Sequence, residues 1–359
     1  MNLRELEEIR SCLCALQNHI RDEVLKARSQ NEHMDMAAVV AETAADTIYQ
    51  IDKISEEAIF EWFERHWPES MPVEIVMEGV EEDKPVTFPY GTAVEGTLWK
   101  CLIDPIDGTR NIMYDKRAAW ILAGVAPQRG RETNIADIVV SAMTELPPSK
   151  QTFSDQLSAV IGQGQSGIRF QRINLVEKTS RTMKVRPSQA TDFKHGFASM
   201  ARFFPEGKEL TARVEEKLWE ELYGLGKTSS PLVFDDQYIS TGGQIYEILS
   251  GHDRMLADLR PIVFRKLGLE SSLVCHPYDI CTWLILQEAG GIIEQPDGSP
   301  LSAPMDTTSP VSWIGFANST LAEAVRPVLR RLMQEHLDHV PEAPQDAPEG
   351  VSDGSNIAL

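Results

Sequence analysis

A short polar segment between two apolar stretches places the strongest constraint on the fold. Residues 99–104 (WKCLID) and 118–126 (AAWILAGVA) have the composition of buried strands, and the octapeptide Asp104-Pro105-Ile106-Asp107-Gly108-Thr109-Arg110-Asn111 begins where the first strand ends. Because Pro105 stiffens the turn, both aspartate carboxylates and the Ile106 carbonyl can point at one place. Hard cations such as Mg²⁺ prefer carboxylate and carbonyl oxygens. The segment therefore predicts a metal site at the end of a strand.

The residues after the second aspartate suit a ligand that comes close to the backbone. Gly108 has no side chain, and a helical turn that begins at Thr109 would direct free N–H groups at an anion such as phosphate. The alternative is a loop in which an aspartate caps a turn. Two aspartates alone would favour that loop, whereas the whole octapeptide directly after a strand favours the metal site.

Helices and strands alternate along the chain without the regular βα period of a barrel, which predicts a layered α/β (α+β) sandwich. Apolar residues recur at helical spacing in four stretches, at 3–27, from about 36 to 67, at 208–223 and at 319–337. Strands are expected at 74–78, at intervals through 135–185 and from about residue 193.

The same patterns divide the chain into three parts. Residues 1–190 form an N-terminal half that carries the octapeptide, and residues 191–337 form a C-terminal half. Residues 338–359 are rich in proline and acidic residues, which is typical of a solvated tail.

Composition excludes several classes of partner. The 359 residues include 54 acidic and 34 basic side chains, a net charge of −20, so we expect no binding to a nucleic acid polymer or to an anionic membrane surface. No apolar run approaches the roughly 20 residues that a membrane span needs. The five cysteines are few and odd in number, and the first residues lack the pattern of a signal peptide. We therefore expect a cytoplasmic protein.

Two motifs together resemble the inositol monophosphatase superfamily, which also includes fructose-1,6-bisphosphatase and the bisphosphate nucleotidases. The DPIDGT string at 104–109 is similar to the metal-binding signature of that family. Tyr278-Asp279 and the later Glu288-Ala289-Gly290-Gly291 are similar to its second motif, a Trp-Asp followed by Glu-Ala-Gly-Gly. The resemblance covers about residues 35–335. It implies an αβαβα sandwich of the sugar-phosphatase type, a homodimer, and Mg²⁺-dependent hydrolysis of a small phosphorylated metabolite.

The resemblance also implies roles for individual residues. Asp104, the Ile106 carbonyl and Asp107 would be shared ligands of catalytic Mg²⁺ ions, two or three in number, and Asp279 would be a further ligand. Glu78, at the end of a strand, fits the remaining carboxylate better than Glu81 or Glu82, because strand ends fix ligands better than loops do. The residues expected to contact the substrate are Asp107, Gly108, Thr109, Gly242, Gly243 and Asp279.

In the same family, a Thr-Asp pair works with the signature threonine to orient the attacking water. The matching positions here are Ile51-Asp52, so the aspartate is present and the threonine is not. Asp52, Thr109 and Glu78 would be the catalytic residues. The alternative for Asp52 is an acidic residue on the solvated face of a helix.

The substrate half departs from the family pattern. In Ser240-Thr241-Gly242-Gly243-Gln244 a glutamine replaces a small residue, and residues 261–274 form an extra segment. Either Asp253 or Asp258 could stand for the family acid that binds sugar hydroxyls. These departures predict that myo-inositol phosphate itself is not the substrate.

Three other functions remain as alternatives. A fructose-1,6-bisphosphatase or a 3′(2′),5′-bisphosphate nucleotidase would need a basic pocket for a second phosphate. The candidates for that pocket are Arg110, Arg254, Arg260, Arg265 and Lys266. A non-catalytic binding or regulatory relative would explain the lost threonine before Asp52 and the altered spacing after Asp279.

Two further signals favour structural roles. Gly162-Gln163-Gly164-Gln165-Ser166-Gly167 matches the dinucleotide-binding pattern G-x-G-x-x-G, but residues 168–173 alternate like a strand, so a glycine-rich hairpin is expected. His276 precedes Pro277 close to the second motif, and a structural role is the favoured interpretation for it.

Overall fold

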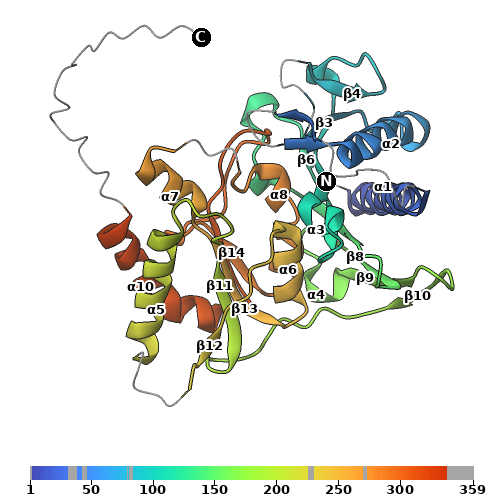
Figure 1. Ribbon diagram of the computed structural model, residues 1–359. Coiled ribbons are helices and arrows are strands. Elements are labelled where there is room, and N and C mark those ends of the chain that lie inside the picture. Colours follow the sequence, from blue (N-terminus) through green and yellow to red (C-terminus); the bar gives the residue numbers. More distant parts are fainter. Residues whose placement is uncertain are drawn as a thin grey trace, which may run out of the picture.

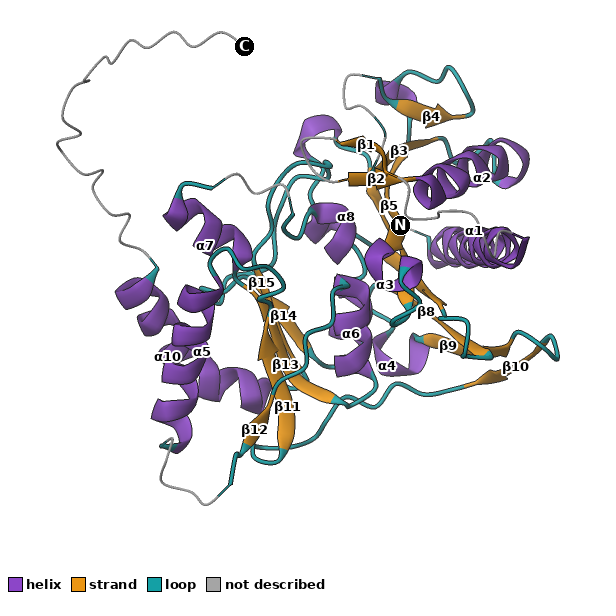
Figure 2. Ribbon diagram, viewed as in Figure 1, coloured by secondary structure: helices purple, strands orange, loops and turns teal. Residues whose placement is uncertain are grey.

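The computed structural model describes residues 2–30, 39–42, 47–78, 80, 84–224, 230–269 and 273–337, with side chains left out at 29–30, 39–42, 47–55 and 57. Two β-sheets and the helices around them form five layers (Figures 1 and 2). The order is helices, large sheet, helices, small sheet, helices, which confirms the predicted αβαβα sandwich. The predicted tail at 338–359 lies outside the described residues.

The first layer consists of α1 (Leu3–Gln30) and α2 (Gln50–His66), which pack against each other and against the large sheet. The expected helix at 3–27 is confirmed, and its apolar side chains are buried at helical spacing. They are Leu6, Ile9, Leu13, Leu16, Ile20 and Val24.

The expected helix at 36–67 is wrong in its first part. Residues there form an antiparallel pair of strands, β1 (Val39–Glu42) and β2 (Thr47–Tyr49), before α2 begins. Both strands contain β-branched residues, which favour extended backbone, and a short apolar run cannot by itself distinguish a helix from a strand.

The large sheet contains eight strands in the order β10-β9-β8-β7-β6-β5-β3-β4. All neighbours are antiparallel except β3 and β5. The strands are β3 (Val73–Met77), β4 (Val86–Phe88), β5 (Trp99–Asp107), β6 (Ala119–Pro127), β7 (Val140–Leu146), β8 (Phe153–Val160), β9 (Arg169–Asn174) and β10 (Thr179–Thr182). Strands β5 to β7 are buried almost throughout because helices cover both faces, which explains their continuous apolar sequences.

The small sheet has the order β12-β11-β13-β15-β14. Its strands are β11 (Gly196–Met200), β12 (Val233–Phe234), β13 (Asp253–Asp258), β14 (Ile292–Glu294) and β15 (Trp313–Phe316). Helices α6 (Thr241–Leu249), α8 (Pro277–Ile280) and α9 (Trp283–Glu288) form the layer between the sheets, with α6 and α9 in contact with both. The predicted boundary at 190/191 lies between β10 and β11.

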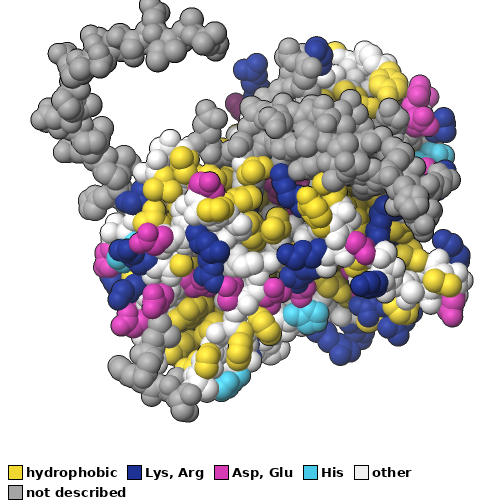
Figure 3. All heavy atoms as spheres, in the orientation of Figure 1, with side chains coloured by type: hydrophobic (Ala, Val, Ile, Leu, Met, Phe, Trp, Pro, Cys, Tyr) yellow, Lys and Arg dark blue, Asp and Glu magenta, His cyan; other side chains and the backbone are white. Residues whose placement is uncertain are grey.

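Helices α5 (Lys208–Tyr223) and α10 (Ser319–His336) form the outer layer on the small sheet, and α7 (Arg260–Leu267) packs against α5. On the face shown in Figure 3, acidic and basic side chains are interspersed with apolar ones. Within the described part of the chain, no helix combines the length and apolarity needed to cross a bilayer.

The glycine-rich segment forms the turn of the β8–β9 hairpin, as the sequence predicts. The Glu288 carboxylate at the end of α9 holds this turn by accepting hydrogen bonds from the backbone N–H groups of Gly162, at 2.8 Å, and Gly164. The acidic residue of the second motif therefore ties the middle helices to the β8–β9 hairpin of the large sheet.

A buried carboxyl group in β7 predicts a pH-dependent stability. Burial raises the pKa of Glu145 from 4.5 to about 7, and the nearby Asp155 carboxylate adds to the rise. Ionisation therefore costs the folded state more than the unfolded state, and the free energy of unfolding should fall as pH rises from about 4.5 to about 7. We expect Glu145→Gln to remove on the order of 2–3 kcal/mol of this fall.

Urea denaturation of the parent and of Glu145→Gln at pH 5 and pH 8 measures this difference. Glu216→Gln removes the same charge from an exposed position on α5 and serves as the control. If the free energy of unfolding falls equally from pH 5 to pH 8 in all three proteins, Glu145 is not the source of the pH dependence.

Candidate active site

A β-bulge brings the two octapeptide aspartates to one side of β5. Asp104 pairs with Leu122 on β6, and Asp107 pairs with Trp120. The two paired residues are three positions apart on β5 but only two positions apart on β6, so β5 contains one extra residue. Side chains alternate along a strand, and residues three apart would otherwise face opposite sides. The extra residue of the bulge shifts this alternation by one position, so that Asp104 and Asp107 face the same side. The Ile106 N–H donates a hydrogen bond to Asp104 Oδ1 at 3.0 Å across the bulge.

The backbone turns sharply after the bulge. Gly108 has φ of +86°, and a Cβ atom there would lie 2.8 Å from the Ile239 carbonyl oxygen, so only glycine fits. Helix α3 (Thr109–Met113) then begins at Thr109, where the sequence predicts a helical turn. The Thr109 hydroxyl donates to the Ile106 carbonyl at 2.9 Å, which holds the carbonyl at the bend.

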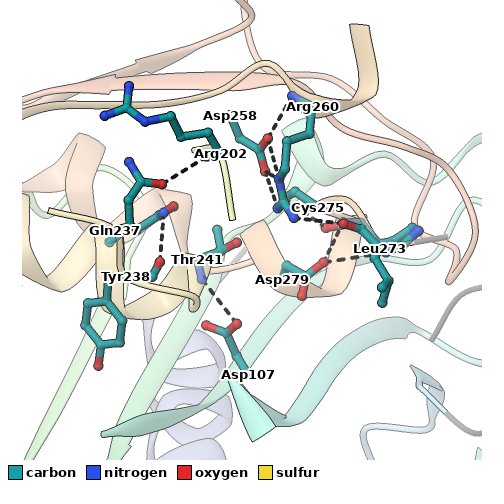
Figure 4. A network of polar contacts seen from close by, with 12 residues as sticks. Asp107, Arg202, Gln237, Tyr238, Thr241, Asp258, Arg260, Leu273, Cys275 and Asp279 are labelled. Atoms are coloured by element: carbon teal, nitrogen blue, oxygen red, sulfur yellow. Dashed lines mark hydrogen bonds and ion pairs between the residues drawn. The ribbon is translucent and has the colours of Figure 1, made fainter. Parts of the chain in front are cut away.

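The Asp107 carboxylate is fixed by the first turn of α6. Its Oδ2 accepts hydrogen bonds from the Ser240 hydroxyl at 2.7 Å and the Gly242 N–H at 2.6 Å, and its Oδ1 accepts from the Thr241 N–H at 3.1 Å (Figure 4). A helix N-terminus stabilises a negative charge because its first N–H groups have no partner within the helix. Helix α6 thus joins the middle layer to the metal motif of the large sheet.

Asp279 comes from the other motif and from the short helix α8. His276 is the N-cap of α8, and Asp279 is the third residue of that helix. Asp279 Oδ2 accepts a hydrogen bond from the His276 N–H at 2.5 Å, which completes a capping box. His276 therefore has the structural role that the sequence favours.

These three aspartates form one acidic cluster. One oxygen from each of Asp104, Asp107 and Asp279 lies within 4.8 Å of the others. Burial raises the pKa of Asp104 well above its usual range, and the charges of Asp107, Asp279 and Glu78 raise it further. Burial and the charge of Asp279 raise the pKa of Asp107 to about 7, against the three hydrogen bonds from α6.

The cluster lies in the wall of a cavity of about 80 Å³, which has room for several water molecules. Glu78, directly after β3, is half-buried and also lines it. The other lining residues are Ile106, Gly108, Thr109, Arg110, Phe203, Phe204, Ile239, Ser240, Thr241, Arg260, Leu273, Val274, Cys275 and Tyr278.

Several predicted site residues lie elsewhere. Gly242 and Gly243 are not among the lining residues. Gly242 packs against Leu122 and so brings α6 close to β6, and Gly243 packs against the ring of Tyr238, which precedes α6. Five other residues that the sequence suggests for substrate binding are also absent from the cavity lining: Asp253, Asp258, Arg254, Arg265 and Lys266. The backbone of Asp52 belongs to α2, but its side chain, like Glu81 and Glu82, lies outside the described residues.

The donors fit a hard divalent cation. All three clustered groups are carboxylates, and hard cations prefer oxygen ligands. The raised pKa values of Asp104 and Asp107 indicate that the surrounding side chains do not compensate the negative charge of these two carboxylates, and a bound cation would do so. The Ile106 carbonyl and Glu78 could supply further oxygens.

Sequence reasoning missed the wall formed by Phe203 and Phe204, and it missed the hydroxyl of Ser240 as a partner of Asp107. Phe203 and Phe204 follow β11 and are ordinary apolar residues in the sequence. No local pattern distinguishes them from core residues, because only the packing of the two sheets brings them to the octapeptide.

The contact between α6 and the metal motif predicts a steric effect at Gly242. A Cβ atom there would lie 2.4 Å from Leu122 Cδ2 and 3.1 Å from Asp107 Oδ2. We expect Gly242→Ala to lower the free energy of unfolding by about 1–3 kcal/mol, as overpacked core sites do. Chemical denaturation measures this loss. In Gly96→Ala the new atom would lie 3.5 Å from Thr92 Cγ2, so this control should keep the parent's stability; equal stability of both variants would contradict the packing argument.

The acidic cluster predicts opposite effects of one substitution with and without a cation. Without divalent cations at pH 8, Asp104→Asn replaces a buried carboxyl group, whose ionisation burial and the charges of Asp107 and Asp279 oppose, by a neutral amide that can still accept from the Ile106 N–H. We expect Asp104→Asn to melt above the parent in chelator, by roughly 2–4 °C per kcal/mol of repulsion removed. Mg²⁺ should then raise the Tm of the parent more than that of the variant. A Tm shift with Mg²⁺ of the same size in both proteins would argue against a metal at this cluster.

Comparison with solved structures places this arrangement among known folds. No family model and no curated protein matches the sequence. The extragenic suppressor protein SuhB from Bartonella henselae is 14% identical, with a TM-score of 0.59 over 91% of this chain and 99% of that one. The fructose-1,6-bisphosphatase from Leishmania major is 13% identical, with a TM-score of 0.60 over 90% and 93%. The inositol monophosphatase from Anabaena is 13% identical, with a TM-score of 0.55 over 93% and 97%. The chain therefore has the fold of the inositol monophosphatases and fructose-1,6-bisphosphatases.

Proposed function

We propose that this protein is a divergent member of the inositol monophosphatase and fructose-1,6-bisphosphatase superfamily. It would hydrolyse a small phosphorylated polyol, sugar or nucleotide with the help of two or three Mg²⁺ ions. The observation that carries the proposal is the cluster of two buried aspartates, Asp104 and Asp107, with the partly buried Asp279 in a cavity wall, on a fold that phosphatases share. We further infer a homodimer that acts on a small metabolite in the cytoplasm.

Four acidic residues would hold the ions. Asp104, Asp107 and Asp279 each offer a carboxylate oxygen at one point, and Glu78 lies close enough for its charge to affect Asp104. Divalent cations at such a cluster lower the pKa of bound water and stabilise phosphoryl and leaving-group oxygens. The hydrogen bonds from α6 keep the Asp107 carboxylate oriented before any ligand binds.

Other residues would orient the reactants. Gly108 and Thr109 line the cavity next to the aspartates, which supports their expected contact with the phosphate group. The Thr109 hydroxyl, Glu78 and Asp52 are the candidates for orienting the attacking water. Phosphoryl transfer needs mainly alignment and charge stabilisation, and the proposal accordingly assigns no side chain as a covalent nucleophile.

One observation favours a bisphosphate ester as a second candidate substrate. Of the five basic residues suggested for a second phosphate, Arg110 and Arg260 line the cavity. A fructose-1,6-bisphosphatase or a bisphosphate nucleotidase would need positive charge at this place.

Release of inorganic phosphate from a panel of monoesters and bisphosphate esters, with and without Mg²⁺, tests the proposal. We expect Mg²⁺-dependent release from the parent and a loss of at least about 100-fold in kcat/KM for Asp104→Asn and Asp279→Asn. Glu216→Gln, an acid-to-amide change on the exposed face of α5, should keep the parent's rate.

Each outcome of the assay decides a separate point. Absence of Mg²⁺-dependent release from every ester would favour a non-catalytic binding relative. Full activity of Asp104→Asn would refute the metal assignment. Inositol 1-phosphate should be hydrolysed more slowly than the best ester of the panel, and an equal or higher rate would refute the inference that the substrate is different.

A further inference from the structure

Arg260 joins the small sheet to the cavity that holds the acidic cluster. Strand β13 ends at Asp258, and α7 begins two residues later with Arg260, close in space to α8 and Asp279. The Arg260 side chain lines the same cavity as Asp104, Asp107 and Asp279 although it is only about one-tenth exposed. Burying a charged guanidinium costs free energy of desolvation, and an arginine on an exposed helix face avoids this cost. The position of Arg260 in the cavity wall therefore calls for an explanation.

Contacts on several sides fix the guanidinium. Asp258 accepts from the Arg260 backbone N–H at 3.0 Å and Nε at 2.9 Å through Oδ1, and from Nη2 through Oδ2. Arg260 Nη1 donates to the Leu273 carbonyl at 2.8 Å. The guanidinium carbon lies 4.7 Å from the centre of the Phe203 ring. The side chain is therefore held in one position before a ligand arrives.

These contacts leave part of the guanidinium available. An arginine has five N–H donors, and the side-chain bonds to Asp258 and Leu273 occupy one on each nitrogen. Among the described residues, no acceptor is assigned to the second hydrogen of Nη1 or of Nη2. Because buried donors normally have partners, a ligand in the cavity is the natural source of the missing acceptor.

We propose that Arg260 is a substrate-binding residue that determines specificity, and that it binds an anionic oxygen of the phosphate ester. The inference rests on the proposed phosphatase function and adds the class of substrate: an ester whose alcohol part carries a second acidic group, a carboxylate or a phosphate. Paired guanidinium donors match such groups in geometry and charge.

The other lining residues near Arg260 support an acidic group rather than several hydroxyls. Phe203, Phe204, Leu273 and Val274 line the cavity with it, and their side chains offer no hydrogen bonds to a polyol. Asp258, the acid closest to Arg260, is about 1% exposed and already accepts from the guanidinium, so it is not available to bind sugar hydroxyls. The fixed guanidinium of Arg260 beside these apolar side chains suits a compact ester with one additional anionic group.

A matched pair of probes tests the proposal by binding rather than by turnover. The hydrolysis-resistant phosphonate analogues of 2-phosphoglycerate and glycerol 2-phosphate differ in a carboxylate that replaces one hydroxymethyl group. We expect calorimetry with Mg²⁺ to show that the parent binds the carboxylate-bearing analogue about 10- to 100-fold more tightly, as expected for hydrogen bonds to a charged group. Arg260→Lys should lose most of this preference, because an ammonium group cannot make the paired contact.

Two further proteins serve as controls. Arg260→Gln combined with Asp258→Asn removes both charges together, so that no buried aspartate is left unpaired if the single variant does not fold. It should bind the two analogues equally. Arg265→Gln removes a positive charge from an exposed position of the same helix, outside the cavity lining, and should keep the parent's preference.

The outcomes show which anionic group of the ester Arg260 binds, and they test this inference separately from the proposed function. If the Arg260 variants lose affinity equally for both analogues and for inorganic phosphate, Arg260 binds the transferred phosphoryl group, and only the second acidic group is refuted. If a folded Arg260 variant binds both analogues as the parent does, or the parent binds neither, the inference is overturned. Phosphate release by the parent judges the phosphatase proposal independently of these results.

Discussion

Three aspartate carboxylates gathered in the interior repel one another, and the fold must hold them together against that repulsion. Each one is fixed by backbone N–H groups from a different local structure. Asp104 accepts from the bulge in β5, Asp107 from the first turn of α6, and Asp279 from the start of α8. The large sheet supplies the first two aspartates, and the helices between the sheets supply the third and the N–H donors of α6. The sandwich therefore assembles the cluster only when the large sheet packs against the middle layer of helices.

The middle helices carry most of this connection. The close approach of α6 to β6 depends on Gly242, which has no side chain to collide with Leu122. Glu288 binds the turn of the β8–β9 hairpin from the other end of the same layer. On the side of the small sheet, Asp258 and Arg260 extend β13 toward the cavity, so that one wall carries the acidic cluster and another carries a fixed cation. This division suits an anionic ligand whose two ends require different partners.

The parts of the site that the sequence predicts are those that lie close together in the chain. Asp104, Ile106, Asp107, Gly108 and Thr109 are nearly consecutive, and their spacing after an apolar strand indicates a bend with converging oxygens. Contacts between distant segments leave no such pattern: Ser240 binds Asp107 from 133 residues away, and Phe203 and Phe204 reach the cavity through the packing of the sheets. The layered fold follows from the alternation of elements, whereas the sequence does not distinguish the strands at 39–42 and 47–49 from helix, because short apolar runs fit both structures.

The central claim is that Asp104, Asp107 and Asp279 bind divalent cations. The most direct measurement is an anomalous difference map from crystals of the protein grown with Mn²⁺, whose scattering distinguishes it from water. The account predicts at least one strong peak within about 2.0–2.4 Å of oxygens from these three side chains, and no such peak in crystals of Asp104→Asn. Mn²⁺ bound only elsewhere, or bound unchanged at the cluster in Asp104→Asn, would contradict it.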